Sequence, residues 1–141
     1  MRDGTARRLS RLHTGIYRLT RGRIGTRLVD NDMLLLTTSG RVTGSPHTVP
    51  LLYLRDADRH VVFASWGGRP DHPEWYLNLL ADPAARVQVS ESRFDVVART
   101  ASGDERDRWW AAAQRAYDGY TVYQSRTDRQ IPVVVLDPEP G

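Results

Sequence analysis

The spacing of apolar residues changes near residue 33 from a helical pattern to a strand-like one. Before that point apolar residues recur at helical spacing, at Leu9, Leu12, Ile16, Tyr17 and Leu19. Gly22 and Gly25 interrupt this pattern, which makes one long helix improbable. After it, short apolar or alternating runs are separated by turn residues. The chain is therefore predicted to have an amphipathic N-terminal arm, residues 1–29, and one folded domain, residues 30–141.

Six segments have the apolar runs or the alternation of β-strands. They are residues 33–39, 48–54, 61–65, 86–90, 93–101 and 131–136. The first is apolar almost throughout, which is typical of a central strand, and Pro50 in the second predicts an edge or a bulge. Six mostly antiparallel strands would leave exposed edges in an open sheet of this size, so we expect a small closed barrel.

Two helices are predicted between the strands, which makes the fold class mainly β with inserted helices (α+β). They begin at capping-box patterns, residues 71–74 and 102–105. The first helix ends before Asp82-Pro83, and Asp118-Gly119 ends the second. Strands and helices do not alternate regularly, so a doubly wound dinucleotide-binding fold is disfavoured.

Composition excludes several classes of site. The chain of 141 residues is 40% hydrophobic and 26% charged, which is typical of one globular domain. It has no cysteine, which excludes disulfide scaffolds, thiolate metal centres and Cys nucleophiles. The four histidines lack metal-ligand spacing, and neither a nucleophile elbow nor a nucleotide phosphate loop is present. We expect no metal site.

Charge is distributed unevenly along the chain. All 20 basic residues are arginine, and residues 1–29 hold eight of them against one acid, a net charge of +7. Such an arm could lie on an anionic membrane surface through residues 1–28, or dock on its own domain. No nucleic-acid-binding fold follows it, so no nucleic-acid partner is expected. Since no apolar run is long enough to span a bilayer and no signal peptide is apparent, we predict a cytoplasmic protein, with peripheral attachment to the inner face of the membrane as an open alternative.

Three segments carry candidate chemistry. In residues 40–44 (GRVTG), Arg41 and Thr43 could donate to a phosphate or carboxylate, although a hairpin turn explains the same pattern. Residues 64–68 (ASWGG) lie between a strand and a helix start, where a phosphate or the polar edge of a planar ring could bind. Tyr117, Tyr120 and Tyr123 could line an aromatic pocket, with a structural stripe as the alternative.

Six stretches, taken in order, resemble the deazaflavin (coenzyme F420)-dependent nitroreductase and quinone reductase family. They lie at residues 17–25, 34–44, 46–51, 64–68, 72–79 and 120–138 and so cover nearly the whole domain. The resemblance implies a six-stranded split β-barrel of the flavin-reductase, FMN-binding type that binds coenzyme F420. It also implies transfer of a hydride from C5 of the reduced cofactor to a quinone, a nitro-heteroaromatic or a similar electron-poor acceptor.

The same resemblance implies which residues form the site. Those gripping the anionic tail of the cofactor would be Arg41, Val42 and Thr43. The ring would be lined by His47, Thr48, Val49, Pro50, Leu51, Leu52, Phe63, Ala64, Ser65 and Trp66. The cleft would be completed by Glu74, Trp75, Tyr76, Leu77 and Asn78. The catalytic set would be Tyr117, Tyr120 and Tyr123 around the acceptor, with Tyr120 also at the cofactor, and Ser65 near the reactive edge of the ring.

Three positions depart from the family pattern. Val42 and Trp66 stand where the family usually has Lys, and His47 replaces a usual Arg. Each charge-assisted contact is worth about 1.5–3 kcal/mol, so an FMN-dependent reductase on the same barrel and a non-catalytic deazaflavin carrier are the alternative functions. Arg69 could replace one lost cation, and Trp66 could stack on the ring. The assembly is expected to be a monomer or a homodimer.

Overall fold

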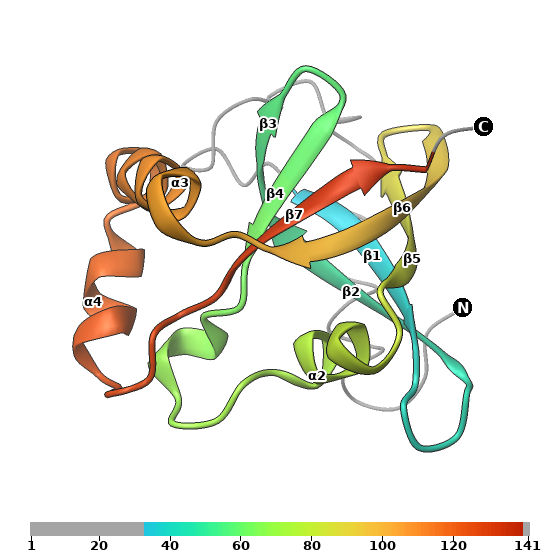
Figure 1. Cartoon of the computed structure of the whole chain (residues 1–141), viewed down its shortest axis with the longest axis horizontal. Coiled ribbons are helices and arrows are strands. Elements are labelled where there is room, and N and C mark those ends of the chain that lie inside the picture. Colours follow the sequence, from blue (N-terminus) through green and yellow to red (C-terminus); the bar gives the residue numbers. More distant parts are fainter. Residues whose placement is uncertain (1–32, 140–141) are drawn as a thin grey trace.

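The computed structural model describes residues 33–139, which form one curled antiparallel sheet with helices around it (Figure 1). Its strands are β1 (Met33–Ser39), β2 (Pro46–Leu52), β3 (Leu54–Asp56), β4 (Arg59–Phe63), β5 (Ala84–Val89), β6 (Ser92–Thr100) and β7 (Val133–Pro138). Their order in the sheet is β2-β1-β5-β6-β7-β4-β3, and every neighbouring pair is antiparallel. The expected mainly β class is confirmed, but the sheet has seven strands rather than six.

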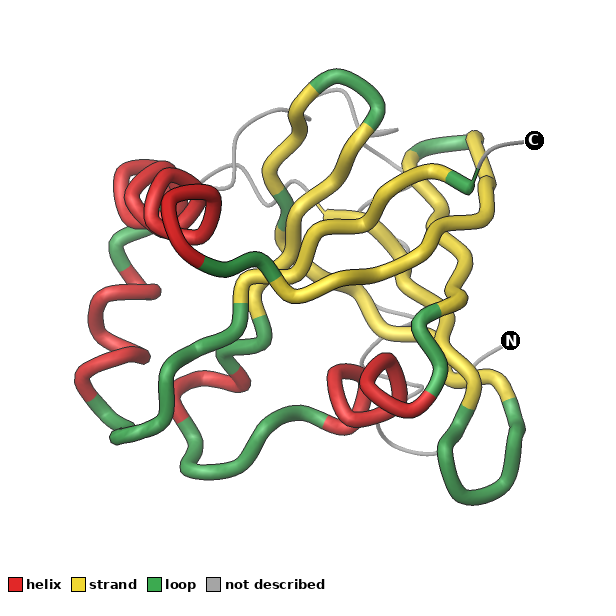
Figure 2. Tube along the Cα trace, in the orientation of Figure 1, coloured by secondary structure: helices red, strands yellow, loops and turns green. Residues whose placement is uncertain are grey.

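The seventh strand arises because the predicted strand 48–54 is two strands that separate at Tyr53. Leu52 still pairs with Met33 of β1, whereas Leu54 pairs with Val61 of β4. β2 and β3 therefore stand at opposite ends of the strand order although one residue connects them. The sheet must curl until its two edges approach each other, but no ladder joins β2 to β3, so it forms the half-barrel seen in Figure 2 rather than the closed barrel that was expected. The Tyr53 side chain, 4% exposed, anchors this bend in the core.

Three helices and a 3₁₀ turn complete the described chain. They are α2 (Glu74–Ala81), α3 (Gly103–Ala116), α4 (Gly119–Ser125) and η2 (Trp66–Gly68). The two predicted helices are confirmed as α2 and α3. α4 begins at Gly119, where the sequence pattern predicted only the end of the second helix, and was not predicted.

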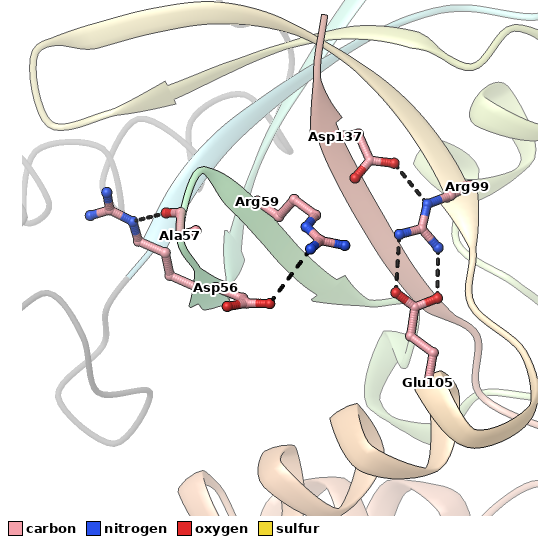
Figure 3. A network of polar contacts seen from close by, with 7 residues as sticks. Asp56, Ala57, Arg59, Arg99, Glu105 and Asp137 are labelled. Atoms are coloured by element: carbon pink, nitrogen blue, oxygen red, sulfur yellow. Dashed lines mark hydrogen bonds and ion pairs between the residues drawn. The ribbon is translucent and has the colours of Figure 1, made fainter.

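The predicted capping boxes are wrong in detail. Pro73, rather than Asp71, is the N-cap of α2, and Ser102 caps α3 without a side-chain hydrogen bond. Glu105 instead accepts two hydrogen bonds from Arg99, at 2.6 and 3.0 Å, and Arg99 also donates to Asp137 at 2.7 Å (Figure 3). Arg99 on β6 therefore binds the Glu105 carboxylate, which the capping-box pattern predicted to bind the backbone at the start of the helix.

Two buried clusters lie on the two faces of the sheet. The interior cluster joins alternate strand residues, such as Val62 and Val96, to Trp75, Tyr76 and Leu79 of α2. The outer cluster joins the other face of β4 and β7 to α3 and α4. α2 therefore closes one end of the barrel, while α3 and α4 cover its outer face (Figure 1).

The predicted arm, residues 1–29, and its membrane-surface role lie outside the described residues. Within residues 33–139, no helix combines the length and the apolar composition that crossing a bilayer requires.

Replacing Tyr53 with alanine should lower the free energy of unfolding by about 3–5 kcal/mol, because the cavity opens where the two edge strands connect. Urea denaturation measures this difference. Leu80→Ala, on the exposed face of α2, is the control and should change stability by about 0.5 kcal/mol. Equal destabilisation by the two substitutions would contradict the role given to Tyr53.

Candidate functional site

The loop between β1 and β2, residues 40–45, is fixed to α2 by Arg41. The backbone N–H and the Nη1 group of Arg41 both donate to Asn78 Oδ1, at 3.1 and 3.0 Å. Nη1 also donates to Glu74 Oε1 at 2.7 Å. The buried Asn78 donates in turn to Thr38 Oγ1 at 3.1 Å, which ties the helix to β1. Nε and Nη2 of Arg41 take no part in these bonds.

The ion pair between Arg41 and Glu74 is weak enough to exchange partners. Its hydrogen bond and the charge of Arg41 hold the pKa of Glu74 below its usual value. Because the pair lies at the surface, it contributes about 1 kcal/mol at most. An anion arriving at the loop can therefore take Arg41 from Glu74. Val42, at the tip of the loop, is exposed and adds no charge.

Arg129 holds the segment that follows β4. Its Nη1, Nη2 and Nε groups donate to three backbone carbonyls, those of Ala64 (3.0 Å), Ser65 (2.8 Å) and Arg69 (2.9 Å). Nη1 also lies 3.0 Å from Nδ1 of His72, just before α2. One guanidinium thus fixes both ends of this segment. Sequence reasoning did not single out Arg129; its only signal was its place within the resembling stretch 120–138.

Gly68 lets the same segment pack closely against α4. A Cβ atom at Gly68 would overlap the carbonyl oxygen of Tyr123 and lie 2.9 Å from Cβ of Arg126. The preceding Trp66 is 40% exposed, and the guanidinium carbon of Arg69 lies 4.7 Å from the centre of its ring. The turn therefore presents an aromatic face and a cation together at the surface.

The three predicted tyrosines come together around α4. Their ring centroids are 5.2 to 6.2 Å apart, and the hydroxyls of Tyr117 and Tyr123 lie 3.2 Å apart. Tyr120 is 4% exposed and packs 5.0 Å from Phe63. The hydrogen bond between the Tyr117 and Tyr123 hydroxyls raises the pKa of Tyr117, and burial raises the pKa of Tyr120 far above its ordinary value. Both phenols stay protonated near neutral pH and so can act as hydrogen-bond donors.

The other predicted residues divide between the surface and the barrel core. Those packed into the interior cluster are Val49, Leu51, Trp75, Tyr76 and Ala64. Thr48 lies on the other face of β2, where its Oγ1 is 2.7 Å from Oγ1 of Thr37, and Leu52 packs against the outer cluster. His47 is exposed, and Nε2 of its ring would lie 2.8 Å from a Cβ atom at Gly40. Pro50 and Leu77 are half-buried, and Thr43 is exposed.

A series of contacts connects the parts of the candidate site. Arg41 reaches α2, His72 before α2 contacts Arg129, and Arg129 holds the segment at Ser65. That segment packs on the tyrosine helix α4 through Gly68. A cation, an exposed aromatic turn and a group of phenols therefore follow one another around the end of the barrel that α2 closes.

The comparisons with known proteins decide the family. Residues 9–138 match the family described as F420H(2)-dependent quinone reductase. The chain belongs to this family. It is 45% identical over 132 residues to an F420H(2)-dependent quinone reductase of Mycobacterium tuberculosis, with 91% of this chain and 89% of the relative covered. The family resemblance inferred from the sequence is confirmed.

Two solved structures agree with this membership. An F420-H2 dependent reductase (FDR-A) is 40% identical, with a TM-score of 0.69 over 74% of this chain and 93% of that chain. A structure described as a domain-swapped dimer is 36% identical, with a TM-score of 0.70 over 88% of this chain and 98% of that chain. The barrel described above is therefore shared with solved structures that are related to this chain in sequence.

Arg129→Lys should loosen the segment between β4 and α2, because an ammonium cannot reach three carbonyls in the fixed geometry of a guanidinium. We expect faster hydrogen exchange at the amides of Gly68 and Arg69, which close the 3₁₀ turn, and a melting temperature lower by several degrees. Arg126→Lys is the matched control, since Arg126 makes one longer bond, 3.3 Å, to Gly67. Unchanged exchange at both amides in Arg129→Lys would refute this positioning role.

Proposed function

We propose that this chain is an oxidoreductase that uses reduced coenzyme F420 to transfer a hydride to a quinone. The observation that carries the proposal is the match of residues 9–138 to the F420H(2)-dependent quinone reductase family. The matched region includes the β1–β2 loop, the segment held by Arg129 and the tyrosine helix. Each of these supplies a group that the reaction requires.

The donor set fits the cofactor. Coenzyme F420 joins a planar ring to an anionic tail, so its site needs a cation and a flat apolar surface. Arg41 lies on an exposed loop with Nε and Nη2 outside its bonds to α2, and Thr43 adds a hydroxyl. Trp66 presents an exposed ring beside Arg69. We propose that Arg41, Val42 and Thr43 bind the tail, with Arg69 supplying a second cation.

We further propose that the remaining resemblance-derived residues hold the ring and close the cleft. Ser65 lies on the segment that Arg129 fixes, which suits a residue placed near the reactive edge of the ring. Glu74 and Asn78 act through Arg41, because both accept its hydrogen bonds. Trp75 and Tyr76, buried at the barrel end, close the cleft from within by holding α2 in position.

When bound, reduced coenzyme F420 supplies a hydride from its ring carbon C5. The protein must hold the acceptor beside that carbon and stabilise the negative charge that develops on the acceptor oxygen. The half-buried hydroxyl of Tyr123 suits this donor role, and its neighbour, the hydroxyl of Tyr117, can replace a proton that Tyr123 gives up. Tyr120, packed on Phe63, forms the wall behind them and is the second candidate donor.

Tyr123→Phe should lower kcat/KM for the quinone menadione about 10- to 100-fold, because one donor to the developing oxyanion is lost while the ring remains. Anaerobic reoxidation of the reduced cofactor, followed by absorbance, measures this rate. Tyr120→Phe tests the second candidate in the same assay, and Ser125→Ala on the same helix is the control. If both phenylalanine variants keep wild-type turnover on menadione and on a nitroimidazole, the assignment of the tyrosines is wrong.

We also infer that nitro-heteroaromatics serve as acceptors, because their nitro oxygens accept the same hydrogen bond as a quinone oxygen. A homodimer is the assembly that the domain-swapped relative supports.

The basic arm suggests that the protein binds its quinone at a membrane surface. We propose that residues 1–28 attach the protein to an anionic membrane surface, because their arginines and regularly spaced apolar residues form a basic amphipathic pattern. The protein should sediment with vesicles of anionic lipid, less so as salt increases, and not with neutral vesicles. If deletion of residues 1–28 leaves sedimentation unchanged, this part of the proposal fails.

A further inference from the structure

A cavity of about 600 Å³ lies at the end of the barrel opposite α2. The two ends of β6 lie at opposite ends of the barrel. At the last residue of the strand, Oγ1 of Thr100 is 2.7 Å from the hydroxyl of Tyr76 on α2. Phe94, near the start of the strand, lines the cavity and is roughly 20 Å from Thr100 along the extended chain. Arg55, Asp58 and His60 line it from the β3–β4 hairpin, Asp95 from β6, and Glu139 from the end of β7. Figure 1 shows both hairpins and the end of β7 on this side. None of these residues belongs to the candidate site above.

His60 is buried in the lining of this cavity with an unsatisfied nitrogen. Its side chain is 5% exposed, and Nδ1 is the one buried side-chain polar atom without a hydrogen-bond partner among the residues that the structure describes. The ring centroid lies 5.4 Å from that of Tyr53 and 5.3 Å from that of Phe94. A polar atom buried without a partner is rare in a native protein and calls for an explanation, of which a ligand group is one.

The charges around the cavity restrict the ligand. Asp58, Asp95 and Glu139 bring three carboxylates to the lining, against the guanidinium of Arg55. Arg86 pairs with Asp95 at 3.0 Å, which still leaves the surroundings of the cavity with one more carboxylate than guanidinium. Burial and the charge of Arg55 lower the pKa of His60, so its imidazole is uncharged near pH 7. A neutral imidazole nitrogen donates or accepts according to its tautomer. The lining therefore disfavours an anion and offers a hydrogen bond of either direction.

We propose that this cavity binds an uncharged aromatic molecule that carries a hydroxyl group, of the phenol or hydroquinone class. The aromatic ring would pack on the half-buried Phe94, and a hydroxyl, being both donor and acceptor, can pair with Nδ1 of His60 in either tautomer. The volume lies within the range of small-molecule pockets, about 300–1,000 Å³. This inference does not depend on the proposed hydride transfer.

The proposal is tested by titrating the full-length protein with 2-naphthol while the ¹⁵N chemical shifts of the histidine rings are recorded. We expect a saturable shift of the His60 signals. Binding of 2-methoxynaphthalene, which lacks the O–H donor, should be about 3- to 10-fold weaker. Binding of the anionic 3-hydroxy-2-naphthoate should be weaker than that of 2-naphthol as well.

Two variants separate this cavity from the tyrosine site. His60→Phe keeps an aromatic ring without the nitrogens, so it should bind 2-naphthol and 2-methoxynaphthalene equally. If His60→Phe does not fold, Glu139→Gln tests the same cavity from its exposed rim. This substitution removes one carboxylate, so the difference in affinity between 2-naphthol and 3-hydroxy-2-naphthoate should become smaller. The proposal is overturned if millimolar 2-naphthol leaves the His60 signals unshifted, or if it shifts only the ring signals of Tyr117, Tyr120 and Tyr123. It is also overturned if a folded His60→Phe variant still binds 2-naphthol and 2-methoxynaphthalene with different affinities.

Discussion

Tyr53 is the one residue between β2 and β3, and these are the two edge strands of the sheet. A seven-strand sheet whose edges are covalently joined over so short a distance cannot remain open, so it curls around an interior of aliphatic side chains. This curl gives the half-barrel two distinct ends. α2 fills one end, where the β1–β2 loop and the tyrosine helix also gather. The hairpins β3–β4 and β5–β6 surround the other end and leave the cavity beside His60.

The end closed by α2 is held together by charged hydrogen bonds rather than by apolar packing alone. Arg41 connects the β1–β2 loop to α2, and Arg129 connects the segment after β4 to His72, two residues before α2 begins. Hydrogen bonds from a charged donor are worth about 1.5–3 kcal/mol each when they are shielded from water. Arg129, which serves three carbonyls, is half-buried, whereas the pair of Arg41 and Glu74 is exposed and open to exchange. This contrast suits a rigid platform beside an adaptable anion-binding loop.

Much of this architecture could be predicted from local sequence. The apolar runs of β1 and β7 and the Asp82-Pro83 stop of α2 are strong local signals, and the tyrosine spacing does place Tyr117, Tyr120 and Tyr123 together. Local pattern failed where the decisive contact is distant along the chain. Residues 48–54 read as one continuous strand because the pairing of Leu54 with Val61 leaves no trace in their alternation. The role of Arg129 could not be predicted, because its partners are backbone carbonyls, which have no sequence signature. Glu105 accepts hydrogen bonds from Arg99 instead of capping the helix, and that contact is not visible in the local pattern.

The barrel binds and uses coenzyme F420 although Val42, Trp66 and His47 stand at positions where the family resemblance implies basic residues. A fluorescence titration of the purified protein with coenzyme F420, run beside one with FMN, tests it most directly. We expect saturable binding of coenzyme F420 and none of FMN. Binding of FMN alone, or of neither compound, would contradict the account and show that these three positions mark a loss of the deazaflavin site.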